Sequence, residues 1–174
     1  MEVVVCPLSA VEHAVAAHGA TCLISLMSEP EMIPRPAAID PARHLRLVVN
    51  DIVAPADGLI SPAIGHAQAL VRFAADWDRA RPLVIHCYAG ISRSTAAALI
   101  VLCAVAPAAD EIALARALRA ASPTAAPNRL LVTHGDAALG RGGRLVAALD
   151  AIGDAVLAAE GAVFRLPLPD AGPR

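Results

Sequence analysis

The segment 84–94, VIHCYAGISRS, determines what the rest of the chain has to provide. It predicts a buried apolar strand ending at His86, a tight loop that contains Gly90, and a helix that begins near Ser94. A strand that leads into a helix is the unit of a parallel sheet, because parallel strands need a long crossover between them. The neighbouring segments should therefore supply further strands and helices.

Strand and helix patterns do alternate along the sequence. Short apolar runs predict strands at 2–6, 21–27, 45–49 and 83–86. Helical patterns are found at 9–19, 61–77, 94–105, 110–121, from 127 onward, and through Leu145, Leu149, Ile152 and Val156. This alternation predicts an α/β fold with a mostly parallel sheet of four to five strands flanked by helices. We expect a single domain over 1–160 and an extended C-terminal tail over 161–174.

Local signals indicate where two of these helices begin. Ser9 and Glu12 match a capping box, so Ser9 should open the first helix and Gly19 should end it. Ser61 and Pro62 should open the helix that follows the loop after the third strand.

Cys87 and Arg93 enclose the loop, with five residues between them. A thiol is a nucleophile only as the thiolate, which a helix N-terminus and a nearby cation favour. The amides of a short loop before a helix bind a tetrahedral oxyanion, and the planar guanidinium of Arg93 matches two phosphate oxygens. Gly90 lets the backbone come close to such a ligand. The pattern predicts nucleophilic attack on a phosphate group.

The stretch HCYAGISRS, residues 86–94, resembles the signature loop of the cysteine-based protein tyrosine phosphatases, in their dual-specificity-like branch. The resemblance implies a phosphocysteine intermediate, with Cys87 as nucleophile and Arg93 as phosphate clamp. It also implies that His86 orients the Cys87 backbone and helps to keep the thiolate. Ser94 can donate its hydroxyl to the Cys87 sulfur, or cap the helix. The substrate would lie against Tyr88, Ala89, Gly90, Ile91 and Ser92.

The general acid should come from the loop after the strand 45–49. In a parallel sheet this loop leaves the same edge as the Cys87 loop, and the leaving oxygen of the ester must be protonated there. Asp51 is similar in position to the general acid of dual-specificity phosphatases. Asp57 is the alternative, although its Asp-Gly pair also predicts a turn. Asn128 resembles the family's Asn that braces the phosphate loop, and it equally fits a helix start.

Composition limits the partners. Apolar residues make up 57% of the chain and aromatic residues only 2%, which predicts a core of Ala, Val, Leu and Ile. The net charge is −2 and Lys is absent, which disfavours nucleic acid, anionic membranes, Walker loops and Schiff-base chemistry. Cys6, Cys22 and Cys103 lie in apolar runs and should be core residues, although one of them could pair with Cys87 on oxidation. Without a CxxC pair or a leader, we expect a reduced, cytoplasmic setting.

These observations favour a phosphomonoester hydrolase of the protein tyrosine or dual-specificity type. It should need no metal and no cofactor, since the other His residues have no metal-ligand spacing. Its substrate would be a phosphorylated protein or a small phosphomonoester. One alternative is a phosphate-binding pseudophosphatase, and another is a phosphatase of a phosphoinositide or sugar phosphate. The uncharged residues 88–92 count against polyphosphorylated ligands, because one Arg neutralises one phosphate. Rhodanese-like sulfur chemistry is a third, weaker alternative.

Overall fold

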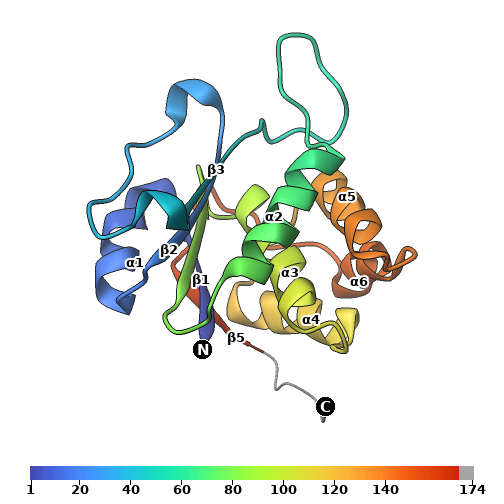
Figure 1. The fold of residues 1–174 in the computed structure, drawn as a ribbon. Helices are drawn as coiled ribbons and strands as arrows, with labels where there is room; N and C mark the ends of the chain where they lie inside the picture. The colour runs from blue at the N-terminus through green and yellow to red at the C-terminus, as the bar shows by residue number, and fades with distance from the viewer. Residues whose placement is uncertain (169–174) are drawn as a thin grey trace.

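The structure is a computed structural model that describes residues 1–168, and a five-stranded sheet lies at its centre (Figure 1). The strands are β1 Glu2–Pro7, β2 Cys22–Met27, β3 His44–Val48, β4 Leu83–Cys87 and β5 Phe164–Pro167. Their order is β3-β2-β4-β1-β5, with the first four parallel and β5 antiparallel to β1. This confirms the predicted α/β fold and its mostly parallel sheet.

Helices cover both faces of the sheet. Helix α1, Val11–His18, packs against β1 and β4 on one face. The other helices lie on the opposite face and are α2 Ile64–Asp76, α3 Arg93–Val105, α4 Glu111–Ala121, α5 Arg129–Leu139 and α6 Arg144–Ile152. Helix α3 is buried along most of its length and lies between α2, α4 and α5. The two faces therefore have separate hydrophobic clusters, with the larger one around α3.

Small side chains allow α3 and α5 to pack closely. Ala96, Ala97 and Ala98 are fully buried in α3, as the aromatic-poor composition predicts. A Cβ on Gly135 of α5 would lie 2.4 Å from Ile100 Cγ1, so only glycine permits this approach. The core is therefore built from closely spaced backbones as well as from large side chains.

The three cysteines outside the loop are buried, as predicted. Burial raises the pKa of Cys6 to about 12, with a smaller contribution from the charge of Cys87. Burial likewise raises the pKa of Cys103 to about 11 and, less strongly, the pKa of Cys22. These residues are neutral thiols at physiological pH.

Three local predictions are wrong. Helix α1 is preceded by a 3-10 turn at Leu8–Ala10, and the Ser9 hydroxyl donates to Glu160 Oε1 at 2.9 Å instead of capping the helix. Helix α2 begins at Ile64, because the His66 ring nitrogen accepts from the Ala63 N–H. Val156 lies outside α6, which ends before Gly153 at a positive φ of 64°.

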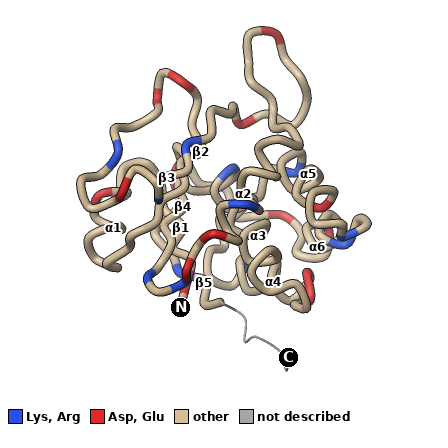
Figure 2. Tube along the Cα trace, in the orientation of Figure 1, with Lys and Arg blue, Asp and Glu red and all other residues tan. Residues whose placement is uncertain are grey.

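Strand β5 lies within the segment predicted as an extended tail. It pairs along β1, and Phe164 and Leu166 point into the core. Residues 169–174 lie outside the described residues, so the tail remains a prediction there. Figure 2 shows the Arg, Asp and Glu residues spread over the helices and loops of both faces. Among the described residues, no helix has the length and apolar character needed to cross a bilayer.

Candidate active site

Cys87 ends β4, the strand between β2 and β1, and α3 begins six residues later at Arg93. The thiol is 1% exposed, and its sulfur lies 3.1 Å from Ser94 Oγ in the first turn of α3. A hydroxyl at this distance can donate a hydrogen bond to a thiolate. The sheet and the helix therefore hold a nucleophile and a hydrogen-bond donor together at one end of the central strand.

The loop 88–92 is held from outside through its carbonyl groups. Four backbone bonds from other segments run from Leu8 N to Tyr88 O (3.0 Å), Gly161 N to Ala89 O (2.8 Å), Ala126 N to Ile91 O (3.0 Å) and Asn128 N to Ser92 O (3.2 Å). Within the described residues, the N–H groups of 89–92 donate no hydrogen bond. Because outward carbonyls leave the amides to face inward, the loop fits a tetrahedral anion above the Cys87 sulfur.

Gly90 is required at its position by conformation and by space. Its φ is +70°, and a Cβ would lie 2.6 Å from Pro7 N and 2.8 Å from the Cys6 carbonyl carbon. The sequence predicts a close approach of the Gly90 backbone to a ligand. The structure shows that Gly90 also lies close to the backbone at the end of β1. Any larger residue would have to displace the loop or this strand end.

Arg93 lies beneath the loop and is 6% exposed. Its Nη1 donates to the Val49 carbonyl at 2.9 Å, and its Nε is 3.9 Å from Asp51 Oδ2. Within residues 1–168 the buried Nε donates no hydrogen bond. The guanidinium therefore keeps donors for an oxyanion, in the geometry that suits phosphate.

Asp51 reaches the loop as its position after β3 predicts. One carboxylate oxygen accepts from Ser92 Oγ at 2.6 Å and from Asn128 Nδ2 at 2.9 Å. Asn128 also caps α5, because its Oδ1 accepts from Leu131 N at 3.0 Å. The Asn128 side chain therefore starts the helix and holds the Asp51 loop, while its backbone N–H bonds the phosphate loop at Ser92.

Asp57 does not reach the loop. It is exposed in a turn in which Leu59 N donates to Ala56 O at 3.2 Å, and no hydrogen bond to another described residue involves its side chain. The structure thus assembles Cys87, Ser94, Arg93 and Asp51 and leaves out the alternative acid.

His86 is fully buried, and it is joined directly to Ser25 and, through Ser25, to His44, two residues that the sequence did not single out for the site. Its Nε2 lies 2.7 Å from Ser25 Oγ, and the same hydroxyl lies 2.8 Å from His44 Nε2. Burial lowers the pKa of His86 to about 4, so the ring is neutral at physiological pH. A neutral ring can orient the Cys87 backbone but brings no positive charge to the Cys87 sulfur. A lone Ser inside the apolar strand 22–27 was the signal that could have pointed to this contact.

Comparison with known proteins gives a likeness of fold. No protein-family model matches the chain, and no curated protein matches it. The crystal structure of DUSP15 matches with a TM-score of 0.60 and 19% identity, covering 85% of this chain and 90% of that one. The crystal structure of human DUSP28 matches with a TM-score of 0.56 and 21% identity, covering 80% of this chain and 92% of that one. The chain has the fold of the dual-specificity phosphatases.

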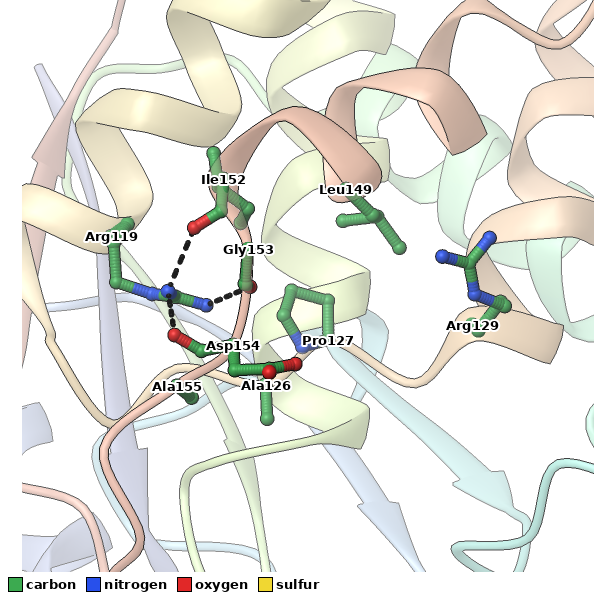
Figure 3. A pocket seen from close by; sticks show the side chains of 9 residues that line it. All are labelled: Arg119, Ala126, Pro127, Arg129, Leu149, Ile152, Gly153, Asp154 and Ala155. Carbon is green, nitrogen blue, oxygen red and sulfur yellow. Dashed lines mark hydrogen bonds between the residues drawn. The ribbon is translucent and has the colours of Figure 1, made fainter.

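Within this dual-specificity phosphatase fold, a separate cavity of about 180 Å³ lies behind the segment that supports the loop (Figure 3). Arg119 lines it, and its guanidinium donates to the carbonyls of Ala125, Ile152, Gly153 and Asp154. Arg129, at the other wall, forms an ion pair with Asp150. Both guanidinium groups are thus bonded to oxygens of the protein itself. This cavity lies where α4, α5 and α6 meet, and it does not form a second phosphate clamp. The described residues also contain no cluster of three or more metal-ligating side chains.

Proposed function

We propose that the protein is a metal-independent phosphomonoester hydrolase of the protein tyrosine or dual-specificity type. One observation carries this proposal: the Cys87 sulfur lies 3.1 Å from Ser94 Oγ at the base of a loop whose amides and whose Arg93 are available to an oxyanion. The substrate would be a phosphorylated protein or a small phosphomonoester. A reducing compartment such as the cytoplasm suits the mechanism, because Cys87 must remain a thiolate.

In the first step the Cys87 thiolate attacks phosphorus, so that an S–P bond forms as the P–O ester bond breaks. The loop amides and Arg93 stabilise the charge on the three phosphoryl oxygens. Asp51, on the same sheet edge, gives its proton to the leaving oxygen, which departs as an alcohol or phenol. His86, Tyr88, Ala89, Gly90, Ile91 and Ser92 form the cradle, and Asn128 holds the Asp51 loop against it.

In the second step water attacks the phosphocysteine. Asp51, now a carboxylate, takes a proton from the water as its oxygen bonds to phosphorus. The S–P bond breaks and the Cys87 thiolate leaves, accepting a hydrogen bond from the Ser94 hydroxyl. Inorganic phosphate is released and the protein returns to its starting state.

Hydrolysis of p-nitrophenyl phosphate and of a phosphotyrosine peptide, with EDTA present, tests the proposal. Cys87→Ser should abolish turnover of both substrates. Asp51→Asn should slow the peptide reaction by roughly 10²- to 10⁴-fold and the nitrophenyl reaction less, because nitrophenol is a good leaving group. Asp57→Asn is the matched control and should leave both rates unchanged. Turnover that survives Cys87→Ser would refute the mechanism.

A phosphate-binding pseudophosphatase is the second candidate, and one observation favours it. Asp51 Oδ1 already accepts two hydrogen bonds, from Ser92 and Asn128, which ties the carboxylate to the loop rather than to a leaving group. Such a protein would bind vanadate or phosphate in a manner that depends on Arg93 and would hydrolyse neither substrate. Turnover by the reduced wild type excludes it.

A further inference from the structure

A line of polar side chains crosses the face of the sheet beneath α1. His86 of β4, Ser25 of β2 and His44 of β3 come from three adjacent strands, and Ser25 and His86 are register partners. Ser25 and His86 are fully buried. Their buried neighbours on this face are apolar, including Val4, Leu23, Ile39 and Val84. Since a buried polar group is costly unless it is hydrogen-bonded, these three residues form one unit.

The donors and acceptors of this unit fix its direction. His86 Nδ1 lies 3.4 Å from the Cys87 carbonyl, which can only accept, so Nδ1 carries the proton. A neutral His86 then presents Nε2 as an acceptor, and Ser25 must donate its hydroxyl proton to it. Ser25 has only one proton, so its oxygen accepts from His44 Nε2–H. The two histidines must therefore hold opposite tautomers.

The far end of the unit agrees with this assignment. His44 Nδ1 is buried and has no hydrogen-bond partner among residues 1–168, as expected for a ring nitrogen without a proton. Burial, with smaller contributions from the charges of Arg46 and Arg35, lowers the pKa of His44 to about 4. His86 faces Arg93 as well as His44, and both disfavour its protonation. A second proton on either ring is therefore disfavoured.

We propose that Ser25 and His44 are positioning residues of the active site. They donate in sequence, His44 to Ser25 and Ser25 to His86, and so hold His86 in the tautomer that donates to the Cys87 carbonyl. The first peptide of the phosphate loop is thereby anchored to the edge strand β3. The expected effect on kcat rests on the proposed function, whereas the hydrogen bonds and the tautomers of the two histidines do not.

Nitrogen-15 NMR of the six histidine rings in the wild-type protein tests the structural content without any turnover. We expect the Nδ1–H tautomer for the ring whose signals are lost in His86→Asn, and the Nε2–H tautomer for the ring whose signals are lost in His44→Gln. Both should stay neutral down to pH 5. The same tautomer at His86 and His44, or titration of either of these rings above pH 6, would overturn the proposal.

Substitution of Ser25 tests the link to Cys87. Ser25→Ala should remove the single tautomer of His86 and lower kcat about tenfold, the effect of about 1.4 kcal/mol at the transition state. Ser25→Thr, which keeps the hydroxyl, should restore both. Ser122→Ala removes another buried hydroxyl, one whose only partner among residues 1–168 is Thr124 Oγ1 at 3.2 Å, and should change neither.

The outcomes separate the two proposals. If wild type turns over and Ser25→Ala keeps both its kcat and the His86 tautomer, the positioning role is refuted and the phosphatase stands. If reduced wild type hydrolyses no phosphomonoester, the proposed function fails, and the tautomers still decide whether the hydrogen-bonded unit exists.

Discussion

Replacing Gly90 by Ala tests how the phosphate loop is held. The backbone at this residue is left-handed, with φ +70°, which costs an L-residue about 1 kcal/mol. The new methyl would also lie 2.6 Å from Pro7 N, a backbone atom that cannot rotate away. Overpacking of this kind adds about 1–3 kcal/mol. We therefore expect Gly90→Ala to lower the free energy of unfolding by about 2–4 kcal/mol and to lower kcat sharply, because the loop must move.

Gly58→Ala is the matched control. Gly58 has a similar φ of +74°, and no atom lies within 4 Å of the added Cβ. It should lose only the conformational part, about 1 kcal/mol, and keep its activity. Urea unfolding followed by circular dichroism measures the first quantity, and nitrophenyl phosphate hydrolysis measures the second. Equal destabilisation of the two variants would refute the contact between Gly90 and the end of β1.

Three further predictions concern acid stability, the Asp51 loop and the last strand. His86 has a pKa of about 4 when folded and 6.5 as a free side chain, so the unfolded state binds more protons between these values and stability falls as the pH falls. His86 alone should cost about 2 kcal/mol between pH 7 and pH 5 in urea unfolding, and a stability that does not change with pH would contradict this. Asn128→Ala should lower both the rate of phosphotyrosine hydrolysis and the free energy of unfolding, whereas Asn128→Asp should lower mainly the rate, since Asp keeps the cap of α5 but cannot donate to Asp51. Equal effects of both variants on rate and stability would count against the brace. A chain ending at Glu160 lacks Phe164 and Leu166 and exposes the core residues that they cover, so its free energy of unfolding should be about 3–6 kcal/mol lower than that of a chain ending at Leu168. An unchanged urea midpoint would show that β5 does not stabilise the fold.

The fold was predictable from the sequence because its signals are local and repeated. Apolar runs such as 22–27 and 83–87 are buried on both sides, as strands of a parallel sheet must be, and helical periodicity marks the faces of the helices. One error occurs where a distant residue competes with a local signal. Ser9 matches a capping box, but Glu160 takes its hydroxyl across the end of the sheet.

The site was predictable in two stages. Cys87, Arg93 and Ser94 follow from one short motif, because a strand, a loop and a helix bring them together without help from the rest of the chain. Asp51 needed the topology, since it meets Ser92 only because β3 and β4 run parallel and end at the same edge. Asp57, only six residues further, lies on the far side of a turn, and spacing alone did not separate the two.

Ser25 and His44 could not be found this way, and the reason is physical. The hydrogen bonds that join His86 to Ser25 and Ser25 to His44 depend on strand register, which places residues 25, 44 and 86 on one face although no spacing in the sequence connects them. The same holds for the carbonyls of the loop, which are bound from residues 8, 126, 128 and 161. A short motif therefore names the atoms that we propose to react, whereas segments from the whole described chain fix their positions. Variants that weaken catalysis without touching the motif should accordingly cluster at these supporting residues.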